Sequence, residues 1–115
     1  MADPSDIQNL ASDSDLDAAL DASREQDVVL YKHSSTCPIS ARAQDEMKAL
    51  AGNGGPPIYE VVVQHARDVS DEIEDEFGIR HETPQAILVR DGEATFDTSH
   101  DDVTEENVRS HLSDG

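Results

Sequence analysis

The segment VVLYKHSSTCPIS, residues 28–40, decides the fold of this 115-residue chain. Its first part, Val28 to Tyr31, is a short continuous apolar run, as expected of a strand that is buried on both faces. Its last part, Thr36-Cys37-Pro38-Ile39-Ser40, opens a predicted helix, because proline is favoured in the first turn of a helix. A cysteine at the start of a helix is typical of a reactive thiol. Cys37 is the only cysteine, and Ser40 stands where a second, resolving cysteine would be.

The flanking sequence predicts alternating helices and strands. Residues 1–12 are polar and acidic and supply at most a short edge strand, and Ser14 is the predicted N-cap of a helix that runs through Ser23. The later predicted elements are a helix over 38–51, a strand over 58–63, a helix over 69–77 closed by Gly78, hairpin strands over 86–90 and 94–98 around Asp91-Gly92, and a helix from Thr104 through Leu112. This order predicts one α/β domain over residues 13–113, with a central mixed sheet covered by helices on both faces.

The charge of the chain excludes some classes of partner. Asp and Glu number 26 against 8 Lys and Arg, which gives a formal net charge of -18 at pH 7. Nucleic acid and anionic membrane surfaces both require basic residues, so neither is an expected partner. An acidic surface can recruit basic partners, or it can be an adaptation to high salt that keeps a protein hydrated. We favour salt adaptation, because the acidic residues are spread evenly along the chain, as in proteins of extreme halophiles.

Two further features indicate where the protein acts. No apolar stretch is long enough to span a bilayer, and the start of the chain lacks the basic and apolar regions of a signal peptide. A single cysteine cannot form an internal disulfide, which fits a reducing compartment. We therefore expect a cytoplasmic protein, and the high net charge favours a monomer.

Four short motifs in order carry a resemblance to a known family: Tyr31-Lys32-His33-Ser34, Cys37-Pro38-Ile39-Ser40, His81-Glu82-Thr83-Pro84-Gln85 and Ser99-His100. With the order of elements, they resemble the thioredoxin fold, a three-layer α/β/α arrangement around a central mixed sheet. Within that fold the chain is similar to the YtxJ-type bacilliredoxin-like family, small monothiol proteins tied to the low-molecular-weight thiol bacillithiol. The family often has a basic residue just before the cysteine. This chain has Thr36 there, which leaves one less charge to stabilise a thiolate.

The position of Cys37 favours its ionisation. A free cysteine has a pKa of about 8.5, and the free N–H groups and dipole of a helix N-terminus lower it. Pro38 has no N–H, so Ile39 and Ser40 are the expected donors, and the Ser40 hydroxyl is either a further donor or an ordinary first-turn serine. With Ser40 in place of a cysteine, an outside thiol must resolve any mixed disulfide. The alternative is that Cys37 is simply a small buried hydrophobic residue.

The resemblance implies a monothiol thiol-disulfide oxidoreductase that removes bacillithiol from mixed disulfides on client proteins. Bacillithiol is then a co-substrate, no cofactor is tightly bound, and the partners are the small thiol and S-thiolated clients. The implied catalytic residues are Cys37, Pro38 and Ser40. Thr36, Ile39, Thr83 and a cis Pro84 are the implied substrate-binding residues.

Several residues near this site have weaker claims. His33, His81 and His100 can tune the thiol or protonate a leaving thiolate, and Lys32 can attract carboxylates on the small thiol, but each also fits a structural role. Cys37 and the histidines do not have the spacing of a compact metal site. Two other functions stay open. One is an iron-sulfur cluster carrier like some monothiol glutaredoxins, which usually have Gly-Phe where this chain has Pro38-Ile39, and the other is a non-catalytic thioredoxin-like interaction domain.

Overall fold

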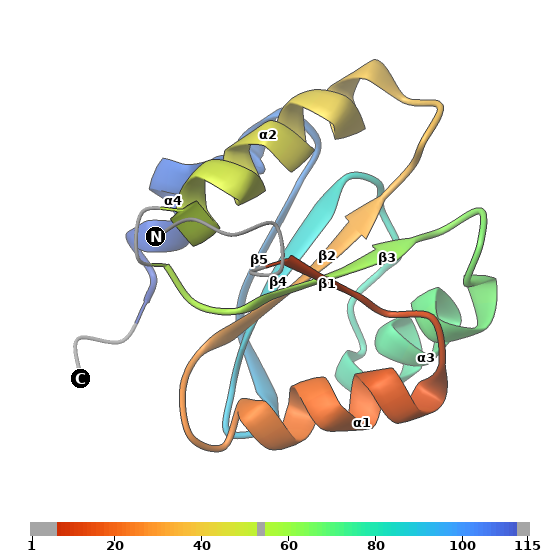
Figure 1. Cartoon of the computed structure of the whole chain (residues 1–115), viewed down its shortest axis with the longest axis vertical. Coiled ribbons are helices and arrows are strands. Elements are labelled where there is room, and N and C mark those ends of the chain that lie inside the picture. Colours follow the sequence, from red (N-terminus) through yellow and green to blue (C-terminus); the bar gives the residue numbers. More distant parts are fainter. Residues whose placement is uncertain (1–6, 53–54, 113–115) are drawn as a thin grey trace.

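A computed structural model of the chain describes residues 7–52 and 55–112. Its strands are β1 (Ile7–Asn9), β2 (Val28–His33), β3 (Ile58–Val62), β4 (Gln85–Arg90) and β5 (Glu93–Ser99). Its helices are α1 (Asp13–Ala22), α2 (Pro38–Gly52), α3 (Arg67–Phe77) and α4 (Glu105–Arg109), with a 3-10 turn at His100–Asp102. The chain forms three layers, in which α2 and α4 cover one face of the sheet and α1 and α3 cover the other (Figure 1).

The sheet is mixed and has the strand order β1-β3-β2-β4-β5. Strands β1, β3 and β2 run parallel to one another, while β4 is antiparallel to β2 and β5 is antiparallel to β4. The polar N-terminal segment takes part in this sheet through the edge strand β1, and Leu10 behind it is buried in the core. Because β2 and β3 are parallel neighbours, their carboxyl ends lie at one edge of the sheet, and this edge carries Cys37.

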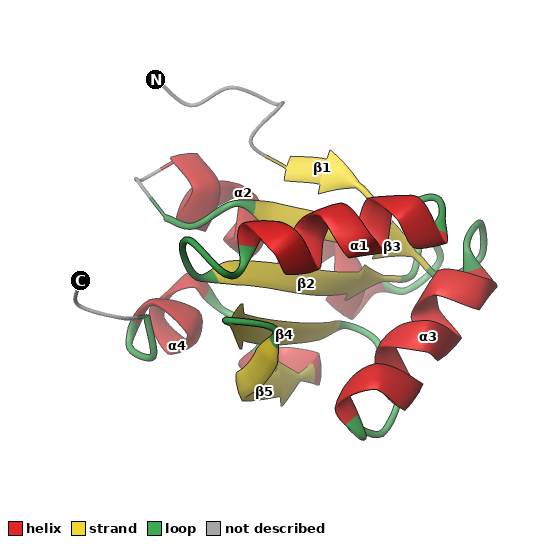
Figure 2. Cartoon of the chain, turned by 90° about the horizontal axis from the view of Figure 1, so that it is seen from below, coloured by secondary structure: helices red, strands yellow, loops and turns green. Residues whose placement is uncertain are grey.

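The core consists of two apolar clusters, one on each face of the sheet. Successive residues of β2 alternate between them, because side chains along a strand point to opposite faces. Val28 and Leu30 pack with α1 and α3, and Val29 and Tyr31 pack with α2 and α4. Figure 2 shows α1 and α3 in front of the sheet, with β4 and β5 below β2. The same alternation directs Lys32 toward the face covered by α1 and α3.

The loops use the turn residues that the sequence predicts. Asp91 and Gly92 both have positive φ angles, 54° and 78°, which is the two-residue turn that suits the twist of a hairpin. Gly78 ends α3 in the left-handed conformation with φ 64°, where residues other than glycine are strained.

Three predicted helix ends are wrong by two or three residues, and one of them is the start of α3, which lies at Arg67 and not at residue 69. The N-cap of α1 is Ser12 and not Ser14, because the Ser12 hydroxyl accepts a hydrogen bond from the Asp15 N–H while the Asp15 carboxylate accepts one from the Ala11 N–H. The last helix begins after Thr104 as predicted but ends at Arg109 instead of Leu112. The Ser110 hydroxyl donates to the Asn107 carbonyl there, and such local bonds compete with continuation of a helix.

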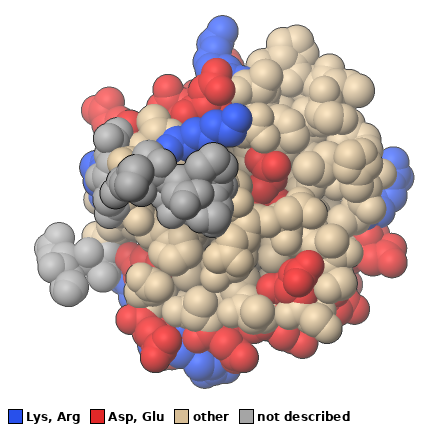
Figure 3. All heavy atoms as spheres, in the orientation of Figure 1, with Lys and Arg blue, Asp and Glu red and all other residues tan. Residues whose placement is uncertain are grey.

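The surface charge is uneven in the view of Figure 3. Acidic side chains gather along the lower edge, over α1, whereas the region over the β2–α2 loop is almost free of them. No helix within the described ranges is long and apolar enough to cross a membrane.

Candidate functional site

The Cys37 thiol lies in the turn that joins β2 to α2 and is partly exposed. The Cys37 N–H donates to the Ser34 carbonyl at 3.3 Å, and the Cys37 carbonyl accepts the first hydrogen bond of the helix from the Ala41 N–H at 3.2 Å. The backbone N–H of Ser40 lowers the pKa of the Cys37 thiol, assisted by the Ile39 N–H and the Ser40 hydroxyl and opposed by partial burial. These donors are the ones expected from the missing N–H of Pro38.

Ser40 occupies a fully buried position in the first turn of α2. Its hydroxyl oxygen accepts a hydrogen bond from the Ser34 N–H at 3.3 Å, and its proton is directed to the Cys37 sulfur. One hydroxyl therefore holds both ends of the turn and favours the thiolate.

Gln64, two residues beyond the end of β3, braces the same turn and was not found from the sequence. Its amide nitrogen lies 2.9 Å from the Ser34 hydroxyl and 3.3 Å from the Thr36 hydroxyl, and its carbonyl accepts from the Ser35 N–H at 3.2 Å. Thr36, predicted as a substrate contact, is exposed and already hydrogen-bonded to this amide. The sequence gives only an indirect indication of Gln64. Residues that follow β3, the parallel neighbour of β2, lie at the same edge of the sheet as Cys37.

Tyr31 links β2 to the first turn of α2 through its buried side chain. Its hydroxyl donates to the Ser40 carbonyl at 2.7 Å and lies 3.0 Å from Nδ1 of His33. A tyrosine has one proton to donate, and burial raises its pKa, so His33 Nδ1 must carry the proton in the second bond. His33 is thus a buried structural partner of Tyr31, and its ring does not hydrogen-bond to Cys37.

The loop before β4 carries the Thr83-Pro84 peptide bond, which is cis. Pro84 is buried and Thr83 is half-buried. His100 connects this loop to the end of β5. Its backbone N–H donates to the Pro84 carbonyl at 2.8 Å, and its ring Nε2 lies 2.9 Å from the Glu82 carboxylate. His100 therefore supports the cis-proline loop.

Lys32 and His81 form a pair on the other face of the sheet. Lys32 is fully buried, and its Nζ lies 3.1 Å from Nδ1 of His81, which is also 3.3 Å from the Ser70 hydroxyl. Burial lowers the pKa of Lys32, and burial together with the Lys32 charge lowers the pKa of His81. The side chain of Lys32 thus lies inside the protein, which fits the structural role that the sequence left open for it.

The sequence model of the monothiol bacilliredoxin BrxC family matches residues 8–108. The chain belongs to this bacilliredoxin family. A solved structure described as an oxidoreductase with a thioredoxin fold is 29% identical, with a TM-score of 0.86, over 92% of this chain and 93% of that one. The bacilliredoxin therefore has a thioredoxin-like fold and a thiol oxidoreductase role.

Two thioredoxins show the fold alone. Fasciola hepatica thioredoxin is 16% identical with a TM-score of 0.74, over 90% of this chain and 93% of that one. A mutant thioredoxin from Halobacterium salinarum is 16% identical with a TM-score of 0.73, over 98% and 96% of the two chains. The three-layer architecture predicted for the bacilliredoxin is confirmed.

Apolar surface is exposed beside the thiol of the bacilliredoxin. Ile39 is 37% exposed, and it is the large hydrophobic residue that stands out on the described surface. Pro38 is exposed next to it, so two apolar side chains flank the sulfur on the helix side. Within the described residues no group of three or more His, Cys, Asp or Glu side chains is arranged to hold a metal ion.

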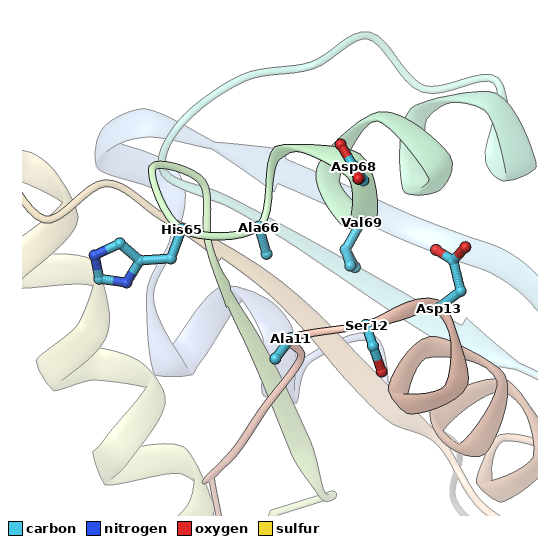
Figure 4. A pocket seen from close by; sticks show the side chains of 7 residues that line it. All are labelled: Ala11, Ser12, Asp13, His65, Ala66, Asp68 and Val69. Carbon is cyan, nitrogen blue, oxygen red and sulfur yellow. The ribbon is translucent and has the colours of Figure 1, made fainter.

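A depression of about 360 Å³ lies between the start of α1 and the start of α3 and does not include Cys37. It is lined by Ala11, Ser12, Asp13, His65, Ala66, Asp68 and Val69. Figure 4 shows the His65 ring directed away from the carboxylates of Asp13 and Asp68. The depression therefore brings no nucleophile and no converging acid–base pair together.

Proposed function

We propose that the protein is a monothiol disulfide oxidoreductase that removes bacillithiol from mixed disulfides on client proteins. The observation that carries this proposal is Cys37, the only cysteine, with its thiolate favoured by the first turn of α2 in a chain of the monothiol bacilliredoxin family. A low thiol pKa increases the fraction of the nucleophilic thiolate near neutral pH.

The first step transfers bacillithiol from the client to the protein. The Cys37 thiolate attacks the bacillithiol sulfur of the client mixed disulfide, and a new disulfide forms between Cys37 and bacillithiol. The old disulfide breaks, and the client cysteine leaves with the electron pair and takes a proton from solvent.

The second step regenerates the thiol. A second bacillithiol attacks, as its thiolate, the bacillithiol sulfur on Cys37, which releases bacillithiol disulfide and the Cys37 thiolate. Over the two steps the client cysteine returns from the disulfide to the thiol, one free bacillithiol is consumed, and both bacillithiol units leave as one bacillithiol disulfide. Ser40 cannot replace the second thiol, because a hydroxyl does not form a disulfide, so bacillithiol acts as co-substrate and no tightly bound cofactor is needed.

Clients are proposed to dock around the thiol through backbone and apolar contacts. Thr83, ahead of the cis Pro84, offers backbone groups to an extended client segment, which is a short form of strand addition. Ile39 offers apolar contact, and Thr36 borders the site on the side of Gln64. The partners in this account are S-thiolated proteins and the small thiol, met by a monomer in the cytoplasm.

The test is release of bacillithiol from a model client that carries one S-bacillithiolated cysteine, followed by intact-mass spectrometry. Without free bacillithiol the wild-type protein should release the client once and keep bacillithiol on Cys37, and it should turn over only when free bacillithiol is added. Cys37→Ser should give no more release than bacillithiol alone. Ser40→Cys should also release the client once without added thiol, but it should then free bacillithiol from Cys37, because the new cysteine can close an internal disulfide with Cys37. Equal rates for wild type and Cys37→Ser would overturn the proposal and favour a non-catalytic domain.

A further inference from the structure

A second depression shares one lining residue, Gln64, with the turn that holds the thiol. It has a volume of about 320 Å³ and is lined by Val63, Gln64, Arg67, Ser70, Asp71 and His81. Gln64 belongs both to this wall and to the brace of the turn, since its amide contacts the hydroxyls of Ser34 and Thr36. Cys37 itself does not line the depression, but Thr36 precedes it, so Gln64 connects the depression with the residue next to the thiol.

We propose that this depression binds a carboxylate of the small-thiol co-substrate through Arg67 and His81, an inference that rests on the proposed function. Of the six arginines, Arg24, Arg80, Arg90 and Arg109 pair with nearby carboxylates. In the part of the chain that the structure describes, Arg42 and Arg67 do not, and of these two only Arg67 lines the depression. Arg67 has no ion pair among the described residues, although the chain is rich in carboxylates. Its guanidinium is therefore free to take a carboxylate from a ligand in a two-pronged contact.

The tautomer of His81 suits the same ligand. An amine is far more basic than an imidazole, so the proton shared between Lys32 and His81 stays on Lys32, which donates to Nδ1. With Nδ1 accepting, a neutral His81 carries its proton on Nε2 and offers an N–H donor. His81 lines the depression, and the buried Lys32 behind it adds positive potential at close range. Three carboxylates act on the ring with the opposite sign, those of Asp71, Glu82 and Glu74, and Glu74 accepts from the His81 backbone N–H at 3.1 Å.

Asp71 gives the depression a second kind of partner. Its carboxylate lies on the same wall as the Arg67 side chain, one helical turn along α3. It repels a second carboxylate of the ligand but accepts a hydrogen bond from an amine or a hydroxyl of the ligand. The lining thus fits a polar thiol that bears a carboxylate together with amine or hydroxyl groups. A thiol without a carboxylate loses the contacts to Arg67 and His81.

The step that reports on this site is the reaction of reduced Cys37 with a symmetrical disulfide. The Cys37 thiolate attacks one sulfur, the new mixed disulfide forms, and the other half leaves as a thiolate. Two disulfides are compared at one KCl concentration: bacillithiol disulfide, which carries carboxylates, and 2-hydroxyethyl disulfide, which is neutral. Stopped-flow rates with both are measured for wild type and for Arg67→Gln, with Arg67→Lys as the conservative variant.

Arg67→Gln should lower the rate constant with bacillithiol disulfide by about tenfold, the effect of one charge-assisted hydrogen-bonded contact, and change the rate with 2-hydroxyethyl disulfide by less than about twofold. Arg67→Lys should retain part of the preference. Arg24→Gln makes the same charge change in the loop that precedes β2, at the other end of this strand from Cys37, and should leave both rates unchanged.

The other outcomes separate this inference from the proposed function. If Arg67→Gln changes neither rate, or slows both disulfides equally, the carboxylate site is wrong while thiol exchange stands. If the wild-type protein reacts with 2-hydroxyethyl disulfide and shows no preference for the carboxylate-bearing disulfide, the site is again overturned alone. If wild-type Cys37 reacts with neither disulfide, the proposed function itself fails and takes the site with it.

Discussion

Tyr31→Phe tests whether the network under the thiol turn stabilises the fold. The substitution deletes the bond to the Ser40 carbonyl at 2.7 Å and the bond to His33 Nδ1 at 3.0 Å. The ring of His33 is only 8% exposed, so its N–H would be left without a partner, which costs about 1–3 kcal/mol. The Ser40 carbonyl lies in a helix and keeps its backbone bond, so the lost second bond adds only about 0.5–1 kcal/mol. We expect the free energy of unfolding to fall by about 2 kcal/mol, partly offset by relaxation.

The assay is urea unfolding followed by circular dichroism, with thermal unfolding as a second measure. For a domain of this length a loss of about 2 kcal/mol lowers Tm by roughly 6–12 °C. The matched control is Tyr59→Phe, because Tyr59 is also buried but its hydroxyl makes no hydrogen bond within the described residues. The control should change the free energy of unfolding by less than about 0.5 kcal/mol.

The outcome that refutes this reasoning is an equal effect of the two substitutions. A loss below about 0.5 kcal/mol for Tyr31→Phe would mean that water satisfies the His33 ring and that the network does not hold the turn. A double-mutant cycle with His33→Phe sharpens the test. The two substitutions together should cost less than the sum of their separate effects, because the second removes the donor that the first leaves unpaired.

The charges and the titrating groups provide three further tests. The rate of Cys37 alkylation by iodoacetamide should reach half of its maximum at a lower pH than the rate for an unperturbed cysteine, and Ser40→Ala should move this midpoint to higher pH. The pH profile of an unperturbed cysteine for the wild-type protein would contradict the account. Because the pKa of His81 is lowered in the folded state, its contribution to stability is present above about pH 6.5 and is lost as pH falls below that value. The free energy of unfolding in urea should therefore fall less between pH 7 and pH 5 for His81→Gln than for wild type. An equal fall would exclude a contribution of His81 to the pH dependence. The Tm should be higher in molar KCl than in dilute buffer, since salt screens the repulsion of a net charge of -18, and equal values would count against salt adaptation.

Most of the fold could be predicted because local signals agree with one another. The buried run at Val28 to Tyr31, the proline at the start of α2 and the Asp91-Gly92 turn each depend on residues close in sequence. The start of α1 was misplaced because two serines compete for the N-cap, and the one that also pairs with Asp15 prevails. The cis bond before Pro84 was expected from the family resemblance and is present.

The site was predictable only where it depends on neighbours in sequence. The donors around Cys37 follow from the missing N–H of Pro38. Gln64 could not be found in this way, because the parallel pairing of β2 and β3 brings it to the thiol turn. For Lys32 the sequence left open a role in attracting carboxylates and a structural role, and the alternation of β2 directs its side chain toward His81 on the face of α1 and α3.

The most direct test of the central claim is intact-mass spectrometry of the reduced protein after mixing with bacillithiol disulfide, and separately with glutathione disulfide, in molar KCl. We predict one adduct on Cys37 that forms much faster with bacillithiol disulfide and is absent in Cys37→Ser. The adduct should persist until free thiol is added, because Ser40 cannot resolve it. No adduct with either disulfide would contradict the account, since Cys37 would then be an inert thiol.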